Sequence, residues 1–101
     1  MSHGLLPRDL DYITQALQRF PEIETASIFG SRAKGNYKPG ADVDVSIKGT
    51  EITPTTVTRL AFLLNEAYPL PYFFDVVHYE SLANQDLAEH IERVGKVIFV
   101  R

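Results

Sequence analysis

Apolar residues recur every three or four positions in three stretches of the chain, which is the spacing of one helical face. The first stretch lies between Pro7, a residue suited to the first turn of a helix, and Pro21, which ends the pattern. The second follows Thr53 and Pro54, a typical helix cap and first helical position. The third covers residues 84–94. The pattern therefore predicts three long helices.

Four shorter stretches have the composition or alternation of strands. Valine and isoleucine alternate with aspartate and serine over residues 42–47, a period of two that is typical of a half-buried strand. Residues 24–29, 72–78 and 97–100 supply the other three. A short helical turn follows the first strand, so the predicted order is α-β-(short α)-β-α-β-α-β. This order indicates an α/β (α+β) fold with a small mixed β-sheet covered by helices, and it leaves the strand order open.

The length fits one domain, residues 1–101, with one core. The composition, 45% hydrophobic and 23% charged residues, is ordinary for a soluble globular protein. A net charge of -3 argues against a surface that grips nucleic acid. The absence of cysteine excludes a thiol nucleophile and a zinc–thiolate site. We expect no membrane span and, from residues 1–4, no secretory signal, so a cytoplasmic location is expected.

A glycine and a serine stand where the first predicted strand ends. Gly30 allows the backbone to bend and a phosphate to approach closely, and the hydroxyl of Ser31 can donate a hydrogen bond to a phosphate oxygen. Arg32 and Lys34 add positive charge beside them. These four residues are the predicted nucleotide-binding group. The alternative is an ordinary strand-to-helix turn in which Arg32 pairs with a local carboxylate.

Two aspartates follow ten residues after Ser31. Asp42 and Asp44 are two positions apart on one strand, so their side chains share a face and repel each other unless a cation binds. Mg²⁺ prefers carboxylate and phosphate oxygens together. Asp75 lies within another apolar strand, where a charge is costly unless it is paired or bound to metal. The alternative for the pair is a solvated strand face. The alternatives for Asp75 are a salt bridge to arginine or lysine and a position at a frayed strand end.

The three acids and the glycine–serine turn together suit phosphoryl transfer with two metal ions. In this hypothesis Asp42, Asp44 and Asp75 are both the metal ligands and the catalytic residues, and Asp75 accepts the proton of the attacking hydroxyl.

This combination resembles the signature of the DNA polymerase beta-like nucleotidyltransferase superfamily. The string from Phe29 to Gly35 and the short chain are similar to its minimal nucleotidyltransferases, the MNT or MntA-like proteins. The resemblance covers most of the chain and implies the polymerase beta-like nucleotidyltransferase fold, two Mg²⁺ ions as cofactors and ATP as substrate. The residues that carry it are Gly30, Ser31, Asp42, Asp44 and Asp75.

The resemblance also implies individual roles. Ser31 would contact the terminal phosphates, Asp42 and Asp44 would bridge both ions, and Asp75 would complete the coordination of one. One departure is Ala41, where many relatives have serine or threonine before the first aspartate. No expected carboxylate is missing, so the pattern gives no reason to expect an inactive enzyme.

The acceptor is implied by the family alone. In minimal members an all-helical HEPN-type protein from a neighbouring gene is the partner, and the chain would be the antitoxin that adds AMP from ATP to a tyrosine of that partner. Only 26 residues (101 minus 75) follow Asp75, so we expect an open site without a separate acceptor domain. A homo-oligomer or a hetero-oligomer would fit this reading.

Two alternatives from other classes remain. The chain could be a catalytically silent antitoxin that neutralises its partner by contact, or a nucleotidyltransferase that acts on a small molecule or a nucleic acid. Replacing both Asp42 and Asp44 separates the first alternative from enzymatic action.

Three further groups have weaker signals. Tyr37 and Lys38 lie in the loop before the aspartates and are equally suited to ligand contact or to no role. The aromatic run at residues 72–74 is expected in the core. His90, between glutamates on the last helix, is expected on a solvated face.

Overall fold

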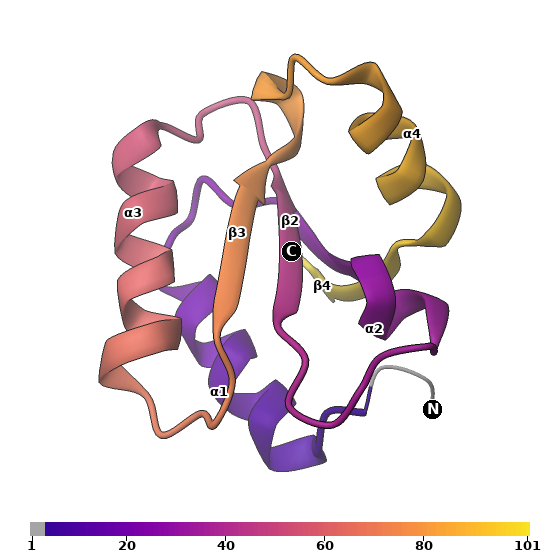
Figure 1. The fold of residues 1–101 in the computed structure, drawn as a ribbon. Helices are drawn as coiled ribbons and strands as arrows, with labels where there is room; N and C mark the ends of the chain where they lie inside the picture. Colours follow the sequence, from indigo (N-terminus) through magenta and orange to yellow (C-terminus); the bar gives the residue numbers. More distant parts are fainter. Residues whose placement is uncertain (1–3) are drawn as a thin grey trace.

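The fold, seen in a computed structural model that describes residues 4–101, is a four-stranded sheet with helices on both faces (Figure 1). The predicted fold class and element order are confirmed. Residues 1–3 lie outside the described part, and with them most of the N-terminal stretch in which no secretory signal is expected. The elements are α1 (Pro7–Gln18), β1 (Thr25–Phe29), α2 (Gly30–Lys34), β2 (Val43–Lys48), α3 (Pro54–Phe62), a π-helical turn η1 (Leu63–Ala67), β3 (Phe74–His78), a 3-10 turn η2 (Tyr79–Ser81), α4 (Gln85–Val94) and β4 (Lys96–Val100).

The strand order is β3-β2-β1-β4. β1 pairs antiparallel with both of its neighbours, β2 and β4. β2 and β3 are parallel, and α3 provides the crossover that a parallel pair requires. β3 therefore forms one edge of the sheet, and β4 forms the other.

The two faces of the sheet differ in polarity. One face packs against α1 and α3 and forms the core, while α2 and α4 lie on the other side (Figure 1). Because strand side chains alternate between faces, the polar positions of β2 all fall on the side of α2 and α4. The core-facing strand residues are Ala26, Ile28, Val43, Val45, Ile47, Phe74, Val76 and Phe99.

The helix that crosses from β2 to β3 is fixed at both ends. At its start, Thr53 accepts a hydrogen bond from the backbone of Thr56 (3.3 Å), which caps the helix. At its end the π-helical turn carries Asn65, whose side-chain amide binds both backbone groups of Phe74 (2.7 and 3.0 Å). Asn65 therefore holds β3 in place directly before Asp75.

Three strands begin later than the sequence suggested. β1 begins at Thr25 and β3 at Phe74, and β2 begins at Val43, so Asp42 precedes the strand. Phe74 is buried, and Tyr72 packs against the core, but the Phe73 side chain is 59% exposed. The prediction that the whole aromatic run is core is wrong for Phe73, because this residue lies in the bend that leads into an edge strand.

Candidate active site

The parallel pairing of β2 and β3 brings two of the predicted carboxylates together. Asp44 and Asp75 are direct partners in the register, so their side chains project from the same face of adjacent strands. Neighbouring strands lie about 4.8 Å apart. Asp42, two residues before Asp44, lies at the entry to β2 and is exposed. The structure thus places all three aspartates at one end of the polar face.

The electrostatics of Asp44 reflect this arrangement. Burial raises the pKa of Asp44 above its ordinary value of 3.8, and the charges of Asp75 and then Asp42 raise it further. Asp44 is partly buried, whereas Asp42 and Asp75 are exposed. Asp75 avoids the burial cost that its apolar neighbours suggested because β3 is an edge strand.

Gly30 lies directly against this group. Its neighbour Phe29 is the register partner of Asp44 across β1 and β2, and Gly30 has a φ of 74°. A Cβ at position 30 would collide with the carboxylate of Asp44. Glycine is therefore required twice, for the left-handed backbone and for the approach to the aspartate. The glycine–serine turn and the aspartates are one site.

Ser31 and Lys34 follow Gly30 on α2, and Lys34 is exposed. Ser31 lines an open pocket of about 410 Å³ together with the loop of residues 36–41. The pocket gives a ligand access to the serine side of the turn. The predicted contacts of Ser31 and Lys34 with phosphate remain predictions.

Arg32 has a different environment from the one that the sequence suggested. Its side chain is only 2% exposed, and its guanidinium lies over the rings of Tyr37 (4.7 Å) and Tyr72 (4.9 Å). Its Nε donates a hydrogen bond to the carbonyl of Ala41 (3.1 Å). These contacts tie α2 to the loop that leads to Asp42. The geometry favours a role for Arg32 in which it positions this loop. The predicted contact of Arg32 with phosphate is less consistent with these contacts.

Arg32→Lys is expected to lower the free energy of unfolding by about 2 kcal/mol, because lysine lacks the planar group that contacts both rings and the Nε donor. Urea unfolding measures this change. Lys34→Gln, two positions away and exposed, is the control and should change stability by less than about 0.5 kcal/mol. Unchanged stability together with weaker ATP binding in Arg32→Lys would instead indicate a direct contact with the nucleotide.

His90 is not on a solvated face, and that prediction is wrong. The Nε2 atom of His90 accepts a hydrogen bond from the backbone N–H of Gly30 (3.2 Å), and its ring meets Phe29 edge-on. No local pattern indicates this contact, because 60 positions separate the two residues. Only the packing of α4 against β1 and α2 reveals it.

The donor set fits a hard divalent cation. Asp44 and Asp75 are register partners, and burial, followed by the charges of Asp75 and Asp42, raises the pKa of Asp44, so a cation beside Asp44 would offset an unfavourable charge. Within residues 4–101, however, no three acidic, histidine or cysteine side chains are arranged so that they could hold a metal ion. Metal coordination by all three aspartates therefore stays a prediction.

The raised pKa of Asp44 predicts a pH dependence of stability in the absence of metal. The folded state binds the Asp44 proton more tightly than the unfolded state, so stability falls as the pH rises through the folded pKa. Compared with Asp44→Asn, the wild type should therefore lose stability between about pH 4 and neutrality. Thermal unfolding of both proteins in EDTA measures the difference. Saturating Mg²⁺ should reduce it, and a difference that does not vary with pH would contradict the assignment.

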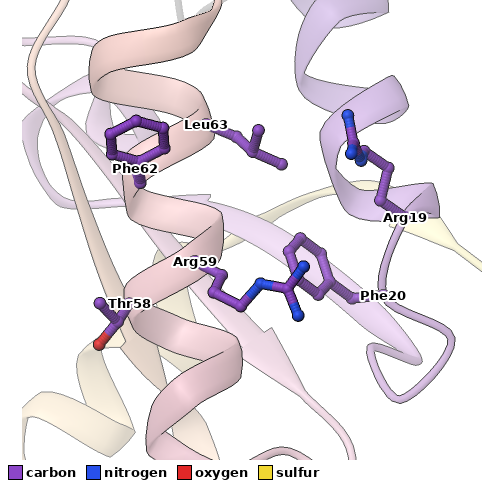
Figure 2. A pocket seen from close by; sticks show the side chains of 6 residues that line it. All are labelled: Arg19, Phe20, Thr58, Arg59, Phe62 and Leu63. Carbon is purple, nitrogen blue, oxygen red and sulfur yellow. The ribbon is translucent and has the colours of Figure 1, made fainter.

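A larger pocket lies elsewhere. This cavity has a volume of about 490 Å³ and lies between the end of α1 and α3. Figure 2 shows Arg59 directed toward the ring of Phe20. Its lining includes Arg19 and Phe62 but no carboxylate. Because α1 and α3 cover the core face of the sheet, this pocket is separate from the aspartate site.

Among the described residues, no helix has the length and apolar character that a membrane crossing demands.

Comparisons with solved structures agree with this fold. A toxin–antitoxin complex with AMP-PNP contains a chain with a TM-score of 0.75 and 22% identity, over 91% of this chain and 73% of that chain. A complex of the tri-AMPylated HEPN toxin of Shewanella oneidensis with its MNT antitoxin gives 0.71 and 21%, over 93% and 71%. An MntA–HepT toxin–antitoxin complex gives 0.72 and 19%, over 95% and 74%. At these identities the likeness establishes the fold.

Sequence comparison identifies the family. A search of curated protein sequences finds no match. The family model described as polymerase beta, nucleotidyltransferase matches residues 11–101, which include the glycine–serine turn and all three aspartates. The resemblance inferred from the motifs is thereby confirmed at the level of the family. The chain belongs to the polymerase beta nucleotidyltransferase family.

Proposed function

We propose that the protein is a Mg²⁺-dependent nucleotidyltransferase that moves AMP from ATP onto a hydroxyl of a helical HEPN-type partner, and that it acts as the antitoxin of a toxin–antitoxin module. The observation that carries the catalytic part is the pairing of Asp44 with Asp75 directly beside Gly30. Family membership supports the reaction class. The solved complexes of fold relatives with HEPN toxins support the kind of partner.

Each residue of the site has a role in this proposal. Asp42 and Asp44 would hold two Mg²⁺ ions, and Asp75 would complete the coordination of one of them on the open edge of the sheet. Ser31 donates its hydroxyl to a terminal phosphate, and Lys34 adds positive charge nearby. Mg²⁺, when bound, supplies charge stabilisation at the phosphates and lowers the pKa of the attacking hydroxyl.

The chemical step balances without a further reactant. The hydroxyl oxygen of the acceptor forms a bond to the α-phosphorus of ATP, and the bond from that phosphorus to the bridging oxygen of the β-phosphate breaks. Pyrophosphate leaves with the electron pair of that bond. Asp75, exposed at the end of the site, accepts the proton of the hydroxyl. The edge position of β3 leaves room for a protein acceptor.

The test uses ATP labelled at the α-phosphate, Mg²⁺ and the HEPN-type partner that the proposal places in a neighbouring gene. Label on the partner, and its loss when EDTA is added, would support the proposal. No transfer to a folded partner would contradict it. If the protein with both Asp42 and Asp44 replaced still neutralises the partner fully, contact alone is sufficient and the catalytic part of the proposal fails.

A cytoplasmic location follows from the need for ATP and is itself part of the proposal.

A further inference from the structure

The helix α4 reaches the glycine–serine turn through one side chain. His90 accepts the N–H of Gly30 at Nε2 (3.2 Å), and its ring lies 6.2 Å from that of Phe29, nearly perpendicular to it. Because a backbone N–H can only donate, Nε2 must be unprotonated in this contact. The imidazole thus acts as a hydrogen-bond acceptor for the first residue of the turn.

The contact matters because of what the Gly30 peptide controls. Gly30 has a φ of 74°, and space for a side chain at this position is taken by the carboxylate of Asp44. A glycine can leave this conformation more easily than any other residue. Its orientation also determines the direction in which the chain presents Ser31. A hydrogen-bond acceptor from outside the turn therefore restricts the backbone of Gly30, the residue of the site with the greatest conformational freedom.

Other contacts hold α4 on the sheet without touching the turn. Glu92 binds Lys48 of β2 (2.9 Å), and Ile91 is buried beneath the helix. His90 is thus not needed merely to attach α4. It adds a contact that is directed at the site.

We propose that His90 is a positioning residue for the nucleotide site: it accepts the Gly30 N–H and so holds the glycine–serine turn in the arrangement that receives the triphosphate. This inference rests on the proposed function, because it assumes that the turn binds ATP. It assigns α4, which carries none of the family motif, a direct part in nucleotide affinity.

Two substitutions at position 90 separate the hydrogen bond from the ring. Phenylalanine keeps the edge-on contact with Phe29 but removes the acceptor, whereas glutamine keeps an acceptor oxygen at a similar reach. Glu92→Gln is the matched control, because it weakens the other anchor of α4 and leaves the turn untouched. All are compared by calorimetric titration with AMP-PNP and Mg²⁺.

His90→Phe should weaken binding about fivefold, the effect of one lost hydrogen bond. His90→Gln and Glu92→Gln should stay within about twofold of the wild type. Amide hydrogen exchange measured by NMR provides a readout without ligand. The Gly30 amide should lose protection in His90→Phe and keep it in the other two proteins.

Three other outcomes would overturn the inference. Equal affinity of His90→Phe and wild type would show that the contact does not position the turn. Tighter binding would show that His90 competes with phosphate for the Gly30 N–H. Equal losses in His90→Phe and Glu92→Gln would show that only the docking of α4 matters. A wild type that protects Gly30 but binds no AMP-PNP would refute the proposed function instead, which distinguishes the two failures.

Discussion

Replacing Asp44 with asparagine is expected to lower AMP transfer about a thousandfold while it stabilises the metal-free protein. Asparagine has the same shape but no charge, so it removes the proposed metal ligand. It also removes the buried charge, whose desolvation is the main cause of the raised Asp44 pKa, and the repulsion from Asp75 and Asp42, which raises that pKa further. Transfer of labelled AMP to the partner measures the first effect. The melting temperature in EDTA at neutral pH measures the second.

The opposite signs of the two effects are the informative part. A variant that merely unfolds would lose both activity and stability. Asp11→Asn, which neutralises an exposed carboxylate on α1, is the control and should change neither quantity appreciably. If Asp44→Asn keeps a tenth or more of the transfer activity, Asp44 is not a metal ligand in the reaction.

The second large effect is expected for Gly30→Ala. Alanine at a φ of 74° is strained by about 1–2 kcal/mol, and its Cβ collides with the carboxylate of Asp44. The turn or the aspartate must move, and either movement separates the phosphate-binding side of the site from the metal side. We expect a loss of transfer activity of about a hundredfold or more, because misplacement by about an ångström has effects of this size.

Gly35→Ala separates strain from collision. Gly35 has a φ of 84° at the end of α2, but a Cβ there meets nothing within 4 Å. Both alanine variants should therefore lose about 1–2 kcal/mol of stability from the backbone alone. Only Gly30→Ala should lose most of its activity. Similar activities of the two variants would show that the approach of Gly30 to Asp44 is unimportant.

Local patterns predicted most of the secondary structure. The alternation of residues 42–47 predicted the strand and the polar face on which Asp44 lies, because side-chain direction in a strand depends only on position. Asp42 precedes the strand, so the alternation does not fix the direction of its side chain. The pairing of Asp44 with Asp75 was not predictable in this way. It depends on the strand order, which no periodicity encodes.

The contacts missed by the sequence reasoning are those made by tertiary packing. The ring contacts of Arg32 require the loop at Tyr37 and the approach to β3 at Tyr72 to fold against α2. The contact of His90 with Gly30 requires α4 to return to the sheet. For Arg32 the local signal suggested contact with phosphate or with a local carboxylate, and for His90, between two glutamates, it suggested a solvated face.

The two sides of the site also become available at different times during synthesis of the chain. β1 and β2 are neighbours in sequence and bring Gly30 against Asp44 through a short-range antiparallel pair. Asp75 joins only after the crossover through α3 has formed, a non-local step that is slow relative to pairing of neighbouring strands. A nascent chain would therefore bring the turn and the first two aspartates together before Asp75 joins them, and the contact of His90 with Gly30 would form last, when α4 folds back onto the sheet.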